Sequence, residues 1–181
     1  MPSDAELKTL TRLDKQGRFD AALTFGTSLL DNNPDDASLN NMVGVLCARL
    51  DRLDDAVAHY DRALSLRDGY AEAYNNRGNA LVRQEKLDQA IDSFRKAIAV
   101  MPQYAAAHNG LCNALHLAGK PAEAAASAQA ALRLQPNYAE AHNNFGNALL
   151  DLGRPNEAAQ AFSMALRLQP GLVQANAGLG K

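Results

Sequence analysis

The sequence lacks the features that would place it in several common functional classes. It has only two cysteines, Cys47 and Cys112, which are expected to be reduced, buried thiols of a cytoplasmic protein rather than a disulfide. No apolar run approaches the roughly 18 residues of a membrane-spanning helix, and the residues after Met1 are polar and acidic, unlike a secretory signal peptide. The formal net charge of −2 offers no basic surface for DNA or RNA. We therefore expect neither nucleic acid nor membrane among its partners.

Residue groups that carry catalysis are also absent from the sequence. We find no Ser–His–Asp pattern, no paired carboxylates and no glycine-rich cofactor loop, and the terminal AGLGK lacks the first glycine and the Ser/Thr of a phosphate-binding loop. His108, Cys112 and His116 are spaced like metal ligands on one helix, but no fourth ligand lies nearby in the sequence. The sequence predicts a protein that is not catalytic by itself and that holds no cofactor and no metal.

What the sequence has is a repeat of 34 residues. Residues 71–104 overlay residues 37–70, 105–138 and 139–172 when the chain is shifted by that length. The fixed points are Ala22, Ala56, Ala90, Ala124 and Ala158, together with Pro34, Pro102, Pro136 and Pro170. Self-similarity at this interval indicates an array of like structural units. We assign the whole chain, residues 1–181, to a single array with units at 3–36, 37–70, 71–104, 105–138 and 139–172, and a partial sixth unit or cap at 173–181.

Each unit predicts two helices separated by tight turns. Gly119 and Gly153, at position 15 of their units, suit a left-handed residue just after a helix, and Pro121 and Pro155 follow in the first turn of the next helix. The proline at position 32 ends the second helix, because it has no N–H to donate. Neither helix can bury its apolar stripe alone. Stacked units should therefore form an all-α solenoid with a groove lined by the first helix of each unit.

The pattern within the unit resembles the tetratricopeptide repeat. The unit at 71–104 matches that family at Tyr74, Gly78, Leu81, Ala90, Phe94, Ala97 and Pro102. The resemblance implies a right-handed superhelical solenoid of helix-turn-helix units that binds other proteins. Arg77 departs from the pattern, since leucine is usual there, and we expect its stem to pack while the guanidinium reaches water. The alternative is a functional arginine directed into the groove.

Asparagine recurs on the first helix of each unit. Position 5 holds Asn41, Asn75, Asn109 and Asn143; position 9 holds Asn79, Asn113 and Asn147; position 6 adds Asn76 and Asn144, with Gly110 interrupting that column. Positions 5 and 9 lie one helical turn apart, on one face. The resemblance implies that this face lines the groove, as in the repeat domain of O-linked N-acetylglucosamine transferase, where an asparagine ladder holds the substrate peptide. The alternative is that these asparagines are common consensus residues that only solvate the helix.

A second column, at position 13, changes in character along the chain. It runs Lys15, Arg49, Arg83, Leu117, Asp151, from basic through apolar to acidic. Arg49 and Arg83 would suit a partner with acidic groups near the N-terminal end of the groove. The alternative is that the column is a solvated row of charges.

Three functions remain open at this point. The first is a scaffold or adaptor that binds an extended peptide segment of a protein partner in the groove. The second is the substrate-recruiting arm of a larger enzyme, such as a glycosyltransferase or sulfotransferase, cut at Lys181; the unfinished sixth unit suggests a fragment of a longer protein. The third is a self-assembly module that associates weakly through its terminal helices.

Overall fold

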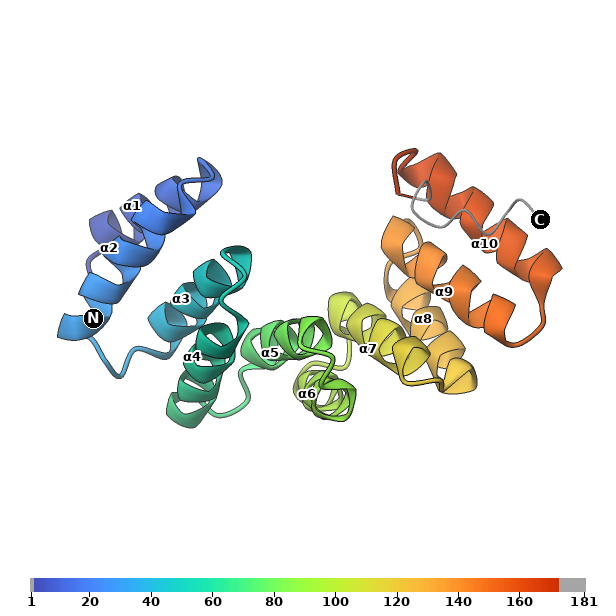
Figure 1. Ribbon diagram of the computed structural model, residues 1–181, viewed down its shortest axis with the longest axis horizontal. Coiled ribbons are helices and arrows are strands. Elements are labelled where there is room, and N and C mark those ends of the chain that lie inside the picture. The colour runs from blue at the N-terminus through green and yellow to red at the C-terminus, as the bar shows by residue number, and fades with distance from the viewer. Residues whose placement is uncertain (1, 173–181) are drawn as a thin grey trace. The chain divides into compact units, whose positions relative to one another are not determined.

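The protein is built from paired α-helices, as a computed structural model that describes residues 2–172 shows (Figure 1). The helices are α1 Asp4–Lys15, α2 Phe19–Asn32, α3 Ala37–Arg49, α4 Leu53–Leu66, α5 Ala71–Arg83, α6 Leu87–Val100, α7 Ala105–Leu117, α8 Pro121–Leu134, α9 Ala139–Asp151 and α10 Pro155–Leu168. These residues contain no strand, so the predicted all-α class is confirmed. The predicted sixth unit lies outside the described residues.

The chain divides into two compact units, 1–86 and 87–181. In the N-terminal unit, α1 packs on α2 and α3 on α4, while α2 also contacts α3 and α4 contacts α5. In the C-terminal unit the same order holds for α7 with α8, α9 with α10, α6 with α7 and α8 with α9 (Figure 1). First helices of successive repeats also touch, α3 with α5 and α7 with α9. Among the described helices, none is both long and apolar enough to cross a membrane.

The turn within each helix pair uses a left-handed residue at position 15. Gly119 and Gly153 have φ of 70° and 69°, as predicted, and Asp51 and Glu85 adopt φ of 61° and 60° although they carry side chains. The next backbone N–H returns to a carbonyl five residues earlier, as in Lys86 N–H to the preceding helix at 2.9 Å. This bond satisfies a carbonyl that the end of a helix would leave unpaired.

The two helices of a pair approach closely where glycine faces an aromatic ring. In α3 and α9, Gly44 and Gly146 lie against the rings of Tyr60 and Phe162. A Cβ at Gly44 would lie 2.7 Å from Tyr60 Cε1, and one at Gly146 would lie 2.6 Å from Phe162 Cε1. The ring therefore occupies the space that a side chain at position 8 would need.

In two other repeats, residues of different sizes occupy positions 8 and 24. Gly26 stands where an aromatic residue is usual, and Leu10, fully buried at position 8 of the same repeat, lies 3.4 Å from the point where a Gly26 Cβ would be. In the fourth repeat Cys112 faces the helix that carries Ala128. Burial raises the pKa of the Cys112 thiol to about 12, so the thiol stays protonated. Cys47 and Cys112 are both free and buried, as predicted.

Candidate functional site

The candidate site in each unit is the surface formed by positions 5, 6, 9 and 13 of its first helices, here named the first-helix face of that unit. In the N-terminal unit this face is formed by α1, α3 and α5, and in the C-terminal unit by α7 and α9. Position 5 and position 9 residues lie one turn apart on the same helix, so their side chains leave the helix in the same direction. Each unit therefore carries its own part of the predicted asparagine column.

Asparagines at positions 5 and 6 hydrogen-bond to each other between neighbouring repeats. Asn76 donates from Nδ2 to Asn41 Oδ1 at 3.1 Å, and Asn144 donates from Nδ2 to Asn109 Oδ1 at 2.9 Å. Both pairs join residues 35 apart, because position 6 of one repeat lies beside position 5 of the one before. Asn109 also donates to the hydroxyl of Tyr138 at 3.4 Å. Sequence reasoning placed these asparagines on one face but did not foresee that they pair.

The predicted position 5 residues differ in their surroundings. Asn41 and Asn109 use Oδ1 within the protein, while Asn143 is half-buried. Asn75 is only 6% exposed, and within residues 2–172 its buried Oδ1 has no hydrogen-bond partner. The position 6 residue of the following repeat is Gly110, which carries no side-chain amide.

The position 9 asparagines are not engaged by other residues of the described chain. Asn79 is exposed, and Asn113 and Asn147 are half-buried. Across the described part of the chain, no hydrogen bond engages any of these three side chains. Each therefore offers both an N–H donor and a C=O acceptor to a ligand.

The two arginines predicted for the face both bind other residues of the protein, although their side chains are almost half exposed. Arg83 donates from Nη1 to the Ala48 carbonyl and from Nη2 to Asp51 Oδ1, both at 2.6 Å, so it caps the C-terminal end of α3. Arg49 lies 3.3 Å from Asp14 through Nε, and its guanidinium stacks over the Phe19 ring at 5.2 Å. Their side chains remain 47% (Arg49) and 46% (Arg83) exposed.

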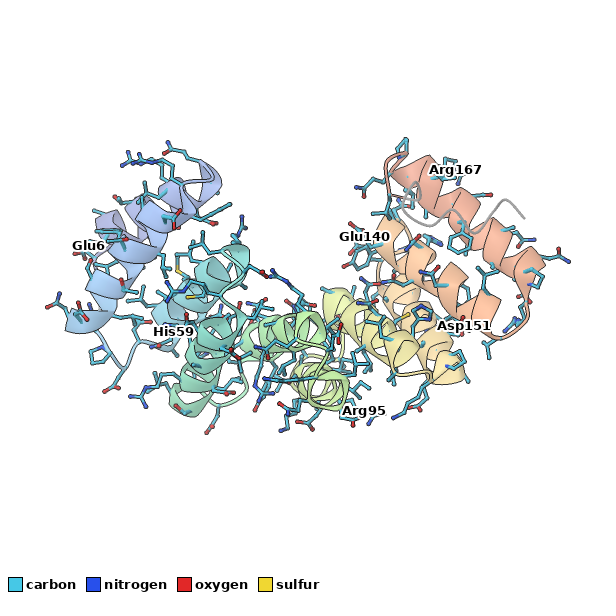
Figure 2. All side chains as sticks on the ribbon, in the orientation of Figure 1. Glu6, His59, Arg95, Glu140, Asp151 and Arg167 are labelled. Atoms are coloured by element: carbon cyan, nitrogen blue, oxygen red, sulfur yellow. The ribbon has the colours of Figure 1, made fainter. Side chains whose placement is uncertain are left out.

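The residues with metal-like spacing take part in other contacts. His116 Nδ1 lies 2.7 Å from Asp151 Oδ2, which extends from the end of α9 (Figure 2), and Cys112 is buried in the core. His108 bonds from Nε2 to the Pro102 carbonyl at 2.9 Å. In the described chain, no group of three or more His, Cys, Asp or Glu side chains could hold a metal ion.

Sequence reasoning missed a set of polar residues at position 4 that tie three of the first helices, α3, α7 and α9, to the turn before them. A side-chain nitrogen there bonds to the carbonyl of the position 32 proline, six residues earlier. The pairs are Asn40 with Pro34 at 3.1 Å, His108 with Pro102 at 2.9 Å and His142 with Pro136 at 2.9 Å. A polar residue six positions after each repeat proline was the available signal. These bonds fix where these three helices begin, and so help to position the first-helix face.

Two hollows lie along the face in the N-terminal unit. The larger, about 210 Å³, lies between α3 and α5 and is lined by Asn76, Asn79, Arg49, Arg83 and Tyr60 among others. The smaller, about 120 Å³, lies between α1 and α3 and has Asn41 in its wall. Four of the residues predicted from sequence therefore line concave surface.

Comparisons with known proteins agree with the repeat fold. Two family models described as tetratricopeptide repeat match the chain, one over residues 35–103 and one over residues 75–139 and 118–173. No curated protein sequence matches it.

Solved structures resemble the chain over nearly its whole length. TTC0263, a thermophilic TPR protein in Thermus thermophilus, is 27% identical with a TM-score of 0.77, covering 93% of this chain and 92% of the other. MamA from Desulfovibrio magneticus RS-1 is 20% identical with a TM-score of 0.80, covering 93% and 95%. YrrB, described as a TPR protein with an unusual peptide-binding site, is 18% identical with a TM-score of 0.73, covering 95% and 89%. Because the family models together span most of the chain and the fold agrees, this protein belongs to the tetratricopeptide repeat family.

Proposed function

We propose that the protein is a non-catalytic interaction scaffold in which the first-helix face of each unit holds an extended segment of a partner protein. The observation that carries the proposal is that the side-chain amides at position 9 make no hydrogen bond within the described chain. These amides belong to Asn79, Asn113 and Asn147, which occupy the same position in three repeats. An extended peptide presents alternating N–H and C=O groups, which an amide side chain can match with its own acceptor and donor.

The amide pairs between repeats support the proposal by holding neighbouring side chains in place. With Oδ1 of Asn41 occupied by Asn76, the amide of Asn41 is oriented and both its N–H donors remain available. Asn109 Oδ1 is held in the same way by Asn144, and one Asn109 N–H is used by the Tyr138 hydroxyl. A side chain that is already ordered loses less conformational entropy when a ligand binds, so less of the binding free energy is lost.

Membership of the tetratricopeptide repeat family supports the proposed peptide-binding function. Solenoids of stacked repeats present extended concave surfaces that serve for binding, and YrrB, similar in fold, is described as having a peptide-binding site. The two buried free thiols fit a reducing compartment, so we propose the cytoplasm as the place where the scaffold works.

A display experiment tests the proposal. Peptides of twelve random residues displayed on phage are selected against the wild-type protein, and the selected peptides are measured against the triple variant Asn79→Ala, Asn113→Ala, Asn147→Ala. Each lost amide removes hydrogen bonds worth about 1 kcal/mol, so we expect Kd to rise by roughly tenfold or more. The far-ultraviolet circular dichroism and the melting temperature should stay the same, because these side chains make no bonds within the described fold.

The control is a second triple variant, Asn32→Ala, Asn137→Ala, Asn156→Ala, which removes three exposed asparagines away from the face. Peptides whose backbone nitrogens are methylated one at a time provide an independent readout, because methylation removes the N–H but leaves the side chains. Affinity that survives both the face variant and every methylated peptide would refute backbone recognition.

A further inference from the structure

Three hollows of the N-terminal unit, on α1, α3 and α5, share residues in their walls and are here called the track. A shallow hollow on α1 and the 120 Å³ hollow between α1 and α3 share Thr11. The 120 Å³ hollow and the 210 Å³ hollow between α3 and α5 share Val45. A single extended segment could therefore contact all three in order.

The track carries an excess of positive charge. Its lining includes five basic residues and two acidic ones: Lys8, Arg12, Lys15, Arg49 and Arg83 against Asp4 and Asp14. Three of the cations, all on α1, have no ion pair within the described chain. The whole protein has a net charge of −2, so this local excess is opposite in sign to the rest of the surface. Such a surface attracts acidic segments and repels basic ones.

The 210 Å³ hollow has a tyrosine side chain in its wall. Tyr60 is only 2% exposed, and it lines this hollow together with Arg49 and Arg83. Within residues 2–172 its hydroxyl makes no hydrogen bond, and the nearby charge of Arg83 acts on it. Burial raises the pKa of Tyr60 above its usual value, so the hydroxyl keeps its proton and is a donor. No acceptor within the described residues uses this donor, so it is available to a ligand or to water at the wall of the hollow.

The arginines beside it have donors left for a ligand. A guanidinium has five N–H donors; Arg49 meets Asp14 through Nε, and Arg83 uses one bond from each of Nη1 and Nη2. Carboxylates bind arginine through paired, charge-assisted hydrogen bonds. Two arginines, a tyrosine hydroxyl and two asparagine amides thus surround one small space with donors.

The neighbouring 120 Å³ hollow has a different chemistry. Leu10, Met42, Val45 and Leu46 form most of its wall, with Asn41 and Asp14 at its polar part. Its volume equals about four water molecules at roughly 30 Å³ each, which suits one aliphatic side chain and is too small for a drug-sized ligand.

We propose that the N-terminal unit recognises an acidic segment of the partner, with an aliphatic side chain in the 120 Å³ hollow and a nearby Asp or Glu carboxylate in the 210 Å³ hollow. The inference rests on the proposed function, because it assumes that an extended peptide lies on this face. The inference further specifies which class of peptide binds most tightly and which residues determine this preference. Arg49, Arg83 and Tyr60 donate hydrogen bonds to the Asp or Glu carboxylate. The basic residues of α1 attract the acidic residues that neighbour it in the peptide.

Matched synthetic peptides test the inference. Fluorescein-labelled twelve-residue peptides carry leucine and glutamate one to three residues apart in an aspartate-containing Ser/Gly background. Partner peptides change only Glu to Gln, or only Leu to Ser. Fluorescence anisotropy gives Kd for the wild type, Tyr60→Phe and the double variant Arg49→Gln, Arg83→Gln. The controls are Tyr74→Phe, in the same unit, and the double variant Arg62→Gln, Arg95→Gln, which removes the same charge from exposed arginines on α4 and α6 (Figure 2 labels Arg95).

The wild type should bind the best Glu peptide at least tenfold more tightly than its Gln partner, and more weakly as salt is added. Tyr60→Phe should weaken the Glu peptide about tenfold, as expected for a lost hydrogen bond to a charged group, with an unchanged melting temperature. The double variant Arg49→Gln, Arg83→Gln should lose the preference for Glu, and both controls should keep it.

Two results separate the inference from the proposed function. If library-selected peptides bind through the position 9 asparagines but Glu and Gln peptides bind equally, or Tyr60→Phe changes nothing, the acidic preference is wrong and peptide binding stands. If neither library-selected nor synthetic peptides bind, both proposals are wrong.

Discussion

At the scale of single residues, positions 8 and 24 of each repeat share one volume between two helices. Glycine at position 8 accompanies a ring at position 24 in Gly44 with Tyr60 and in Gly146 with Phe162. The first repeat reverses the sizes, with Leu10 beside Gly26. Cores are packed closely enough that an added methyl group must displace a neighbour. Gly26 stands where an aromatic residue is usual, and the larger side chain of Leu10 therefore fills the space that the ring would occupy.

This reciprocity gives a prediction for the last described repeat. Gly146→Cys would place a Cβ 2.6 Å from the Phe162 ring, so we expect a loss of about 1–3 kcal/mol from overpacking. Phe162→Ala alone should cost about 3–5 kcal/mol through the cavity that it leaves. The double variant Gly146→Cys, Phe162→Ala reproduces the Cys112 and Ala128 pair of the preceding repeat.

Urea unfolding of the single and double variants measures the coupling. Because each change in the pair makes room for the other, the double variant should lose about 1–3 kcal/mol less than the sum of the two single losses. Strict additivity would show that the two positions do not share one volume.

At the scale of the helix pair, the tight turn at position 15 decides how the second helix leaves the first. Three repeats place glycine there, and two place Asp51 and Glu85, with φ near +60°. The left-handed conformation costs a residue with a side chain roughly 1–2 kcal/mol, a cost that glycine avoids. Asp51 has a compensating bond from Arg83 at 2.6 Å, so its side chain contributes to the turn.

Glu85 is the cleaner test of the turn. Replacing it with glycine removes the left-handed strain but adds about 0.5–1 kcal/mol of chain entropy to be lost on folding, so Glu85→Gly should stabilise the protein by about 0.5–1 kcal/mol. Thermal and urea unfolding would measure the gain. The reverse change, Gly119→Ala, should destabilise the protein by a similar amount. A Glu85→Gly variant less stable than the wild type would mean that the glutamate side chain stabilises the turn.

At the scale of the whole molecule, the core is a series of local cores, because each repeat packs mainly on its neighbours. One cluster of the N-terminal unit gathers residues of α1 to α5 around Leu10, Leu39 and Val43. A separate cluster in the C-terminal unit holds Leu149, Phe162 and the small residues around them. In repeat proteins, stability is approximately a sum of repeat and nearest-neighbour contributions.

Local unfolding should follow this division. Leu149→Ala removes a fully buried side chain and should cost about 2–5 kcal/mol. Hydrogen exchange followed by mass spectrometry should show faster exchange in α9 and α10, with α3 and α4 unchanged, since opening can be confined to part of a chain. Leu150→Ala, at a 40% exposed neighbour, is the matched control and should change exchange little. Equal acceleration in all helices would indicate one cooperative unit.

The helices and the fold class could be predicted from the sequence because residues within a single repeat determine where its helices begin and end. Position 15 marks a turn through its left-handed residue, and the position 32 proline ends a helix through its missing N–H. Both effects act within one repeat and recur every 34 residues. The same period indicated the family, which the comparisons confirm.

Only the tertiary structure decided which amides and cations of the face are free. Positions 5, 6 and 9 look alike in sequence, yet the stacking of repeats pairs Asn76 with Asn41, leaves Asn79 unused and turns Arg83 into a cap of α3. These contacts join residues about 35 apart, one position out of step with the 34-residue period. That offset depends on how one helix packs against the next, and no pattern within a single repeat encodes it. The sequence by itself determined the repeated elements, and packing between the repeats determined the site.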